Sequence, residues 1–266
     1  MTLRIAFVGW GAIARRAAGL LVARNDNIVL AGIATRRAPA SDRDLPEGVR
    51  WVPSPDALRD LAPDLVIEAA GRQAVEPWGV ASLRHAPAFA VCSTSAFTDD
   101  ALLQRLVDEA ERCGSQILVP SGALGGLDAL AAAGSLALEQ VTHHIIKPPV
   151  AWRGTPAEEL VDLGALTAAH VFFVGTAREV AARFPANANV AVISALAGLG
   201  LDRTEVALVA DPAVSRNCHK LSVRGDFGAL DVLVENRPLA ENPKSSELTA
   251  LSLVRLIEGR CRTLSL

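Results

Sequence analysis

The chain has 266 residues, half of them apolar, and a formal net charge of -3 at pH 7. It is long enough for one large domain or two smaller ones, and its composition supplies a sizeable core. The weak acidity and the lack of a Lys/Arg block argue against nucleic acid and an anionic membrane surface as partners. The longest largely apolar run, residues 190–201, is too short to cross a bilayer, so no membrane segment is expected.

The cysteines are widely separated and form no Cys-x-x-Cys pair; they are Cys92, Cys113, Cys218 and Cys261. This spacing argues against a zinc site and a disulfide framework. We therefore expect no bound metal and a reducing, cytoplasmic location.

The first element is a short apolar run, Ile5 to Val8, which predicts a buried strand. The strand ends at Gly9-x-Gly11-x-x-Ala14, which leads into a segment whose apolar residues recur with the period of a helix. Gly9 permits a tight turn, Gly11 lets the backbone approach a pyrophosphate, and Ala14 lets the helix pack close to the strand. The first helical amides, including those of Ala12 and Ile13, would face the anion. The pattern predicts a dinucleotide site, although an ordinary tight strand–helix turn would also produce it.

Further apolar runs follow, separated by helix-compatible sequence, at residues 28–34, 65–70, 89–92 and 116–119. Strands that alternate with helices predict a Rossmann-type doubly wound parallel sheet. Before the last of these runs, Thr98 is expected to cap a helix that ends at Gly114.

The end of the second strand bears on the choice of cofactor, because an acid there binds ribose hydroxyls whereas an arginine accepts a 2′-phosphate. The chain has Thr35-Arg36-Arg37 and no acid, which favours NADP or use of both NADP and NAD, with Arg36 as the contact. Ordinary surface charge is the alternative. The small residues Ala70 and Gly71 follow another strand and would form a wall of the cofactor crevice.

The pattern changes at the glycine-rich segment 121–128, after which residues 141–147 read as a strand that ends before Pro148-Pro149. Two capping boxes, at residues 155–158 and 176–179, predict helix starts on either side of a strand at 169–174. A buried helix follows at 190–197, and alternating runs at 204–210, 217–224 and 230–235 predict antiparallel strands with one wet face. The second half is therefore expected to be an α/β domain with a mixed, largely antiparallel sheet, before a last helix at about 248–257.

His219 shares one face of its predicted strand with Leu221 and Val223, so its imidazole should point into the core. The other histidines, His85, His143, His144 and His170, are expected to be structural, because no second ligand-type residue accompanies them at metal spacing. Asn187 and Asn189 stand at the start of a buried helix, where they either cap it or contact a ligand.

In their order along the chain, these motifs resemble the L-aspartate dehydrogenase family, whose members oxidise aspartate to iminoaspartate with NAD or NADP. The matching segments are Gly9-x-Gly11-x-x-Ala14, residues 122–130, Lys147-Pro148-Pro149, residues 184–191, Asp211-Pro212, Asn217-x-His219 and residues 242–246. One departure is Ile145-Ile146-Lys147, where the family usually has Thr-Arg-Lys.

The resemblance implies that His219 is the active-site residue, as acid/base or orienting group, and that Ala123 and Asn189 contact the cofactor. The substrate would be L-aspartate, or in reverse iminoaspartate or oxaloacetate plus ammonia. Its carboxylates need cationic or amide partners, and Lys147, Asn187 and Asn217 are candidates by their chemistry.

The family architecture implies a dinucleotide-binding domain of residues 1–121 with 240–266 and a catalytic and dimerisation domain of residues 122–239. A homodimer is expected through the second sheet, whose outer face is expected to include Val209 and Leu233. The alternatives are another two-domain oxidoreductase, similar to homoserine dehydrogenase or dihydrodipicolinate reductase, and a non-catalytic NADPH-binding redox sensor.

Overall fold

The computed structural model describes residues 2–41 and 45–264, and the chain divides into two compact units. The first unit comprises Met1–Pro120 and Thr249–Leu266, and the second Ser121–Leu248. Residues 240–248, which were expected with the first domain, group with the second unit. They do so because β13 (Asn242–Ser246) pairs with β12 (Pro238–Leu239) and the Ser246 hydroxyl donates to the Asn236 side chain.

The first unit is built on a parallel sheet in the order β3-β2-β1-β4-β5-β6. Its strands are β1 (Leu3–Val8), β2 (Ile28–Ala34), β3 (Arg50–Trp51), β4 (Leu65–Glu68), β5 (Ala88–Val91) and β6 (Gln116–Leu118). Its helices are α1 (Ala12–Arg24), α2 (Leu58–Leu61), α3 (Arg72–His85), α4 (Asp100–Cys113) and α8 (Glu247–Glu258). The alternation of strands and helices confirms the predicted Rossmann-type sheet.

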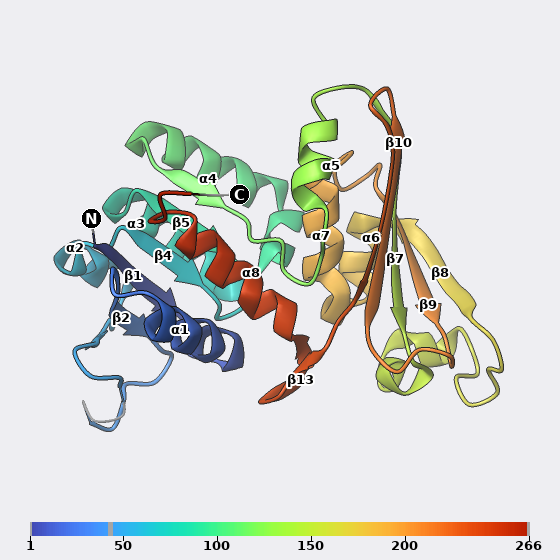
Figure 1. Cartoon of the computed structure of the whole chain (residues 1–266), viewed down its shortest axis with the longest axis horizontal. Coiled ribbons are helices and arrows are strands. Elements are labelled where there is room, and N and C mark those ends of the chain that lie inside the picture. The colour runs from blue at the N-terminus through green and yellow to red at the C-terminus, as the bar shows by residue number, and fades with distance from the viewer. Residues whose placement is uncertain (1, 42–44, 265–266) are drawn as a thin grey trace. The chain divides into compact units, whose positions relative to one another are not determined.

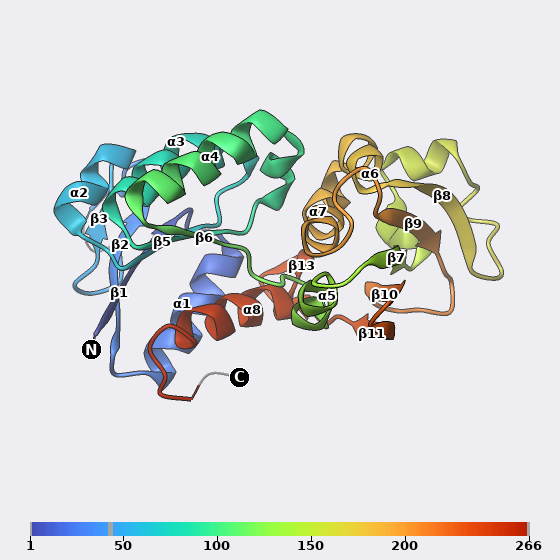
Figure 2. The ribbon, with the colours of Figure 1, turned by 90° about the horizontal axis from the view of Figure 1, so that it is seen from above.

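Helices cover both faces of this sheet: α3 and α4 lie on one side, and α1 and α8 on the other (Figures 1 and 2). Leu253, Val254 and Ile257 of α8 are buried in the same apolar cluster as Phe7 and Leu21, so the last helix completes the core that the first strand begins. Each such side chain contributes about 1.5–3 kcal/mol when fully buried.

Local details of the first unit differ from the sequence-based expectation at strand and helix ends. β4 ends at Glu68 rather than at residue 70, and the short edge strand β3 was not predicted. Asp99, not Thr98, caps α4, because its carboxylate accepts the amide of Leu102; Thr98 belongs to a preceding 3-10 turn. Gly114 ends the helix as predicted, with φ of 65°.

The second unit contains a mixed sheet in the order β11-β10-β7-β9-β8. Its strands are β7 (Leu138–Lys147), β8 (His170–Thr176), β9 (Glu205–Ala210), β10 (Cys218–Gly225) and β11 (Gly228–Glu235). The helices α5 (Leu127–Ala133), α6 (Ala177–Arg183) and α7 (Ala188–Ala197) lie on one side of it (Figure 1). Only the β7–β9 pair is parallel among these neighbours, which confirms a mixed, largely antiparallel sheet.

Two expectations for this unit were wrong. β9 has no wet face, because five of its six residues are buried. The capping box at Thr155 starts only a 3-10 turn, Pro156–Glu159, whereas the box at Thr176 and Glu179 does start α6 with both of its hydrogen bonds.

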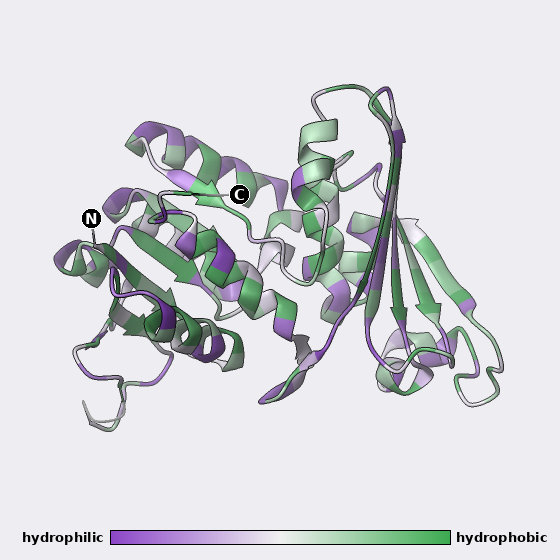
Figure 3. Ribbon diagram, in the orientation of Figure 1, coloured by the Kyte–Doolittle hydropathy of each residue, from purple (hydrophilic) through white to green (hydrophobic). Residues whose placement is uncertain are grey.

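The distribution of hydropathy follows these layers (Figure 3). The strands are largely apolar, and α4 alternates polar and apolar stretches because it buries only Leu102, Leu106 and Ala110 on one face. Within residues 2–41 and 45–264, no helix combines the length and the apolar character that crossing a membrane requires.

Candidate active site

The candidate cofactor site of the first unit begins at the turn between β1 and α1. Gly9 has φ of +94°, and a Cβ built on it would lie 2.6 Å from the carbonyl oxygen of Ala69, so only glycine fits this turn. A Cβ on Gly11 would meet nothing within 4 Å, which leaves open space beside the N-terminal amides of α1. Gly11 caps that helix without a side-chain hydrogen bond, and Ala12 and Ile13 form its first turn. The backbone thus fits a pyrophosphate at this helix end.

A cavity of about 530 Å³ opens at the carboxyl end of the parallel strands. Gly9, Thr35, Arg36, Ala70 and Gly71 line it, together with Trp78 and residues 53–55. Arg36 therefore lies where an adenosine ribose is expected, whereas Arg37 is not among the lining residues. The volume and the lining suit part of a dinucleotide.

Glu68, at the end of β4, lies behind the wall of this cavity and holds its backbone amides. It was not predicted as a site residue. Its side chain is fully buried and accepts hydrogen bonds from the amides of Ala70 and Gly71 at 2.7 and 2.8 Å. It also accepts from the amide and hydroxyl of Ser93, each at 2.9 Å. One carboxylate thus fixes the loops that follow β4 and β5. An acidic residue at the end of an apolar strand is the sequence signal for such a role, because a buried charge needs several hydrogen-bond partners.

The second unit holds His219, near the start of β10. Its imidazole is 5% exposed and points to the helix-covered face with Leu221 and Val223, as the alternation predicted. Burial, and to a smaller extent the charge of Lys147, lower the pKa of His219 to about 3. The ring is therefore neutral near pH 7 and can accept a proton or a hydrogen bond.

His143 on the neighbouring strand β7 is the contact that sequence reasoning did not find. Its Nε2 lies 3.1 Å from Nδ1 of His219, and its Nδ1 lies 3.0 Å from the hydroxyl of Ser194 on α7. His143 is fully buried, and its pKa is held well below its usual value by burial first and by His219 second. It is buried, as expected for a structural histidine, but it contacts the residue singled out for chemistry.

Strand register explains why these groups meet. His219 pairs with Ile145, and His143 and Lys147 stand two residues to either side of Ile145 on the same face of β7. Ile146 points to the other face. Of the two residues that depart from the family pattern, Ile146 therefore lies on the opposite side of the sheet from His219, whereas Ile145 is on the same face and directly opposite it.

Lys147 and Asn187 form the polar end of this cluster. The Lys147 ammonium donates to the side-chain oxygen of Asn187 at 2.5 Å and lies 4.8 Å from the ring centre of Trp152. Burial lowers the pKa of Lys147 to about 8. Asn187 occupies the N-cap position of α7 but makes no capping bond with its side chain, so the interpretation as a simple cap is wrong for this residue.

The remaining candidates are spread around the same unit. Ala123 is buried, and its carbonyl accepts from the side chain of Asn236 at 3.0 Å. Asn217 lies directly before β10, and its carbonyl accepts from the backbone amide of Asn236. Asn236, which was not predicted, thus ties the glycine-rich segment to the start of the His219 strand. Asn189 is in the exposed part of the first turn of α7.

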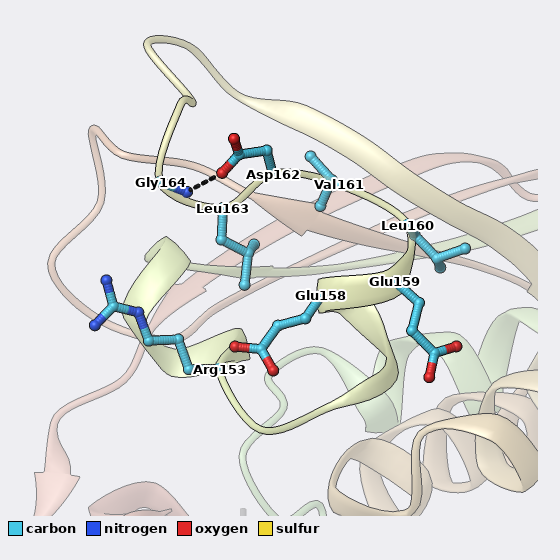
Figure 4. A pocket seen from close by; sticks show the side chains of 8 residues that line it. All are labelled: Arg153, Glu158, Glu159, Leu160, Val161, Asp162, Leu163 and Gly164. Carbon is cyan, nitrogen blue, oxygen red and sulfur yellow. Dashed lines mark hydrogen bonds between the residues drawn. The ribbon is translucent and has the colours of Figure 1, made fainter.

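Another cavity of about 530 Å³ lies in the loops between β7 and β8 (Figure 4). It is lined by residues 153 and 158–164, none of which was predicted as a site residue. Asp162 accepts the amide of Gly164 at 3.0 Å, which shapes the loop. Glu158, Glu159 and Asp162 give this cavity an acidic lining, which does not suit a dicarboxylate.

Comparison with known proteins gives matches over both units. Residues 9–120 match a family described as homoserine dehydrogenase, NAD binding domain, and residues 128–260 match one described as aspartate dehydrogenase, C-terminal. L-aspartate dehydrogenase of Brucella anthropi is 53% identical over 97% of this chain and 97% of its own length. The enzyme of that name from Serratia proteamaculans is 44% identical over 96% of this chain and 98% of its own.

Among solved structures, aspartate dehydrogenase from Thermotoga maritima superposes with a TM-score of 0.76 at 26% identity, covering 99% of both chains. A dihydrodipicolinate reductase from Paenisporosarcina, at 14% identity and a TM-score of 0.53, covers 97% of this chain and 95% of its own and shares the fold.

The parallel sheet, its glycine turn and the matching NAD binding domain define the class of protein, an oxidoreductase that uses NAD or NADP. Within that class the relatives agree over nearly the whole chain. The chain belongs to the L-aspartate dehydrogenase family.

Proposed function

We propose that the protein catalyses the NAD(P)-dependent oxidation of L-aspartate to iminoaspartate, which hydrolyses to oxaloacetate and ammonia. The observation that carries this function is the 53% identity to an L-aspartate dehydrogenase over 97% of both chains. The buried cluster of His219, Lys147 and Asn187 supports it from the chemistry, because it combines a neutral base with cationic and amide groups for carboxylates.

The bound cofactor supplies a nicotinamide that accepts the hydride from the substrate Cα. The amino group must lose a proton for the imine to form, and the neutral ring of His219 is the acceptor in our proposal. The pKa of His219 in the free protein is low, but a bound dicarboxylate would bring negative charge beside Lys147 and raise it toward the working range. Lys147 and Asn187 would hold a substrate carboxylate, with Asn217 beside the start of the same strand.

A preference for NADP, or use of both cofactors, is proposed from Arg36 in the lining of the cavity, with no acid beside it at the end of β2. Contacts of Ala123 and Asn189 with the cofactor are proposed from the family resemblance alone. A role in pyridine nucleotide biosynthesis is proposed on the same basis.

A homodimer through the second sheet is also proposed. Val171 and Val174 on β8 and Leu233 on β11 are 47, 54 and 60% exposed, so both edge strands carry apolar side chains that a second copy could cover. Val209, which was expected to share this role, is only 5% exposed and packs inside the unit. Light scattering at micromolar concentration tests the proposal, and a monomer would contradict it.

The proposed binding partner is the small-molecule substrate. Binding to nucleic acid or to a membrane is not proposed. A cytoplasmic location is proposed because the four cysteines are widely spaced and unpaired in the structure. The rival functions are another two-domain oxidoreductase and a non-catalytic NADPH sensor.

An assay of nicotinamide absorbance distinguishes these functions. L-aspartate with NADP or NAD should give reduced cofactor, whereas D-aspartate, L-malate and L-glutamate should give little. Turnover of L-malate or L-homoserine in preference to L-aspartate would identify a different oxidoreductase. Cofactor binding without turnover of any of these compounds would favour the sensor.

A further inference from the structure

His219 and the two side chains behind it, His143 and Ser194, form a continuous hydrogen-bonded series that ends on the backbone. The Ser194 hydroxyl donates to the carbonyl of Ala191 at 3.0 Å, in the helix α7 that covers the sheet. The same oxygen lies 3.0 Å from Nδ1 of His143, and Nε2 of His143 lies 3.1 Å from Nδ1 of His219. Ser194 and His143 are fully buried, and His219 is nearly so, which isolates the series from water.

The backbone carbonyl fixes the direction of the whole series, because a carbonyl can only accept. With its proton directed to Ala191, Ser194 accepts from Nδ1–H of His143. A neutral imidazole carries one N–H, so Nε2 of His143 is a bare acceptor and Nδ1 of His219 must donate to it. Nε2 of His219 is then left with a free lone pair. The opposite direction would lose the bond to Ala191 and so makes one hydrogen bond fewer.

We propose that Ser194 and His143 are positioning residues that hold His219 as the Nδ1–H tautomer, so that its Nε2 serves as a proton acceptor and not as a donor. This inference rests on the proposed function and deepens it, since it decides between the base and the orienting donor for His219. When Nε2 takes a proton from the substrate amine, the N–H bond of the substrate breaks and an Nε2–H bond forms. The resulting imidazolium keeps its Nδ1–H bond to His143, which becomes a stronger, charge-assisted bond.

Nitrogen-15 NMR of the histidine rings in the free protein tests the tautomer without any turnover. The chain has five histidines, and comparison with a His219→Asn variant assigns the signals of His219. We expect a protonated Nδ1 and an unprotonated Nε2 for that ring at neutral pH. A protonated Nε2 would overturn the proposal, whatever the protein proves to catalyse.

Kinetics of variants test the consequence. Ser194→Ala removes the acceptor that orients His143, and we expect kcat to fall by about tenfold or more with KM within about threefold. Ser252→Ala is the matched control, because the Ser252 hydroxyl makes the same type of bond to Thr249, three residues earlier in α8, far in sequence from the histidines. Its kcat should stay within about twofold of the wild type.

Substitutions of His143 distinguish the effect of its hydrogen bond to His219 from the effect of its packing in the core. The side-chain oxygen of His143→Gln can still accept from Nδ1–H of His219, whereas His143→Leu offers no acceptor. We expect kcat of His143→Leu to fall by about a hundredfold and that of His143→Gln to retain most of the activity. Equal kcat values in Leu and Gln variants that fold like the wild type would overturn the proposal. If His143→Leu does not fold, the ring spectra of the wild type and Ser194→Ala decide. If the wild type does not oxidise aspartate, the proposed function fails while the spectra still decide the tautomer.

Discussion

The two candidate binding regions, one in each unit, differ in the groups that form them. In the first unit the binding surface is backbone: Gly9 and Gly11 open a space at the start of α1, and Glu68 holds two loops by their amides. In the second unit the reactive surface is a set of side chains from two strands and one helix, namely His219, His143, Lys147, Asn187 and Ser194.

Because of this difference, substitutions in the two regions should affect different properties of the protein. A backbone site tolerates no added bulk but is insensitive to most side-chain exchanges, whereas a side-chain site depends on individual functional groups. Substitutions in the His219 cluster should therefore change catalysis, and those around the glycine turn should change affinity for the cofactor.

His219→Ala should lower kcat by about 10²-fold or more if the imidazole moves a proton. Affinity for NADP should stay within about threefold of the wild type, because the cavity lined by Gly9 and Arg36 belongs to the first unit. Steady-state kinetics and a cofactor titration measure both. His170→Ala, an exposed histidine on β8, is the control and should behave as the wild type.

A different result is expected if the His219 imidazole only packs in the core and takes no part in proton transfer. The variant would then lose about 1–3 kcal/mol of stability and keep kcat within a few-fold at temperatures below melting. That result would remove His219 from the chemistry.

Glu68→Gln should have its effect in the first unit. The carboxylate accepts from three amides and one hydroxyl, and an amide group that replaces it presents N–H to at least one of these donors. We expect a loss of about 1.5–3 kcal/mol in stability and weaker binding of the cofactor, with kcat at saturating cofactor little changed. Denaturant unfolding and a titration with NADP measure the two effects.

Glu76→Gln is the matched control for Glu68, since Glu76 forms an exposed ion pair with Arg105. It should change stability by less than about 0.5 kcal/mol. Equal effects of the two substitutions would show that the buried carboxylate does not organise the loops.

Acid should weaken the second unit through its buried histidines. The pKa of His219 is about 3 in the folded protein against a usual 6.5, so below about pH 6.5 the unfolded chain binds protons that the folded chain refuses. The free energy of unfolding therefore falls as the pH falls from about 6.5 toward 3, by about 1.4 kcal/mol per pH unit for each such histidine. His143, whose pKa is also lowered, adds to the effect in the same direction.

Urea unfolding at several values between about pH 7 and pH 5 measures this slope. His219→Asn removes one titrating group and should give a shallower slope than the wild type. His170→Asn, at an exposed position, should leave the slope unchanged. Identical slopes for all three proteins would mean that burial of His219 does not depress its pKa.

The sequence was informative wherever a local pattern is sufficient. The glycine turn after β1 needs only a few consecutive residues, and the inward direction of His219 follows from the alternation of one strand. For Asn187, by contrast, the sequence left a cap and a ligand contact as alternatives, and only the structure shows that its side chain accepts from Lys147, 40 residues away in the chain.

What could not be predicted depends on the register between distant strands. His143 and His219 are 76 residues apart, and nothing in either segment shows that β7 and β10 pair with Ile145 opposite His219. β9 shows a similar limit, because its alternating pattern suggested a wet face although five of its six residues are buried. What covers each face of a strand is a property of the whole unit and not of the strand's own sequence.

The last substitution concerns Arg36, a charged side chain that lines the cavity of the first unit. Arg36 lines the cavity and has no acid beside it, so its guanidinium would bind the 2′-phosphate that distinguishes NADP from NAD. Arg36→Ala should weaken NADP by about tenfold, equal to about 1.4 kcal/mol, and leave the affinity for NAD within about twofold. Arg37→Ala is the matched control, because Arg37 is the adjacent exposed arginine and does not line the cavity, and it should change neither affinity. A wild type that binds NAD tenfold more tightly than NADP, or equal losses in both variants, would reduce Arg36 to ordinary surface charge and leave cofactor binding in this unit entirely to the backbone.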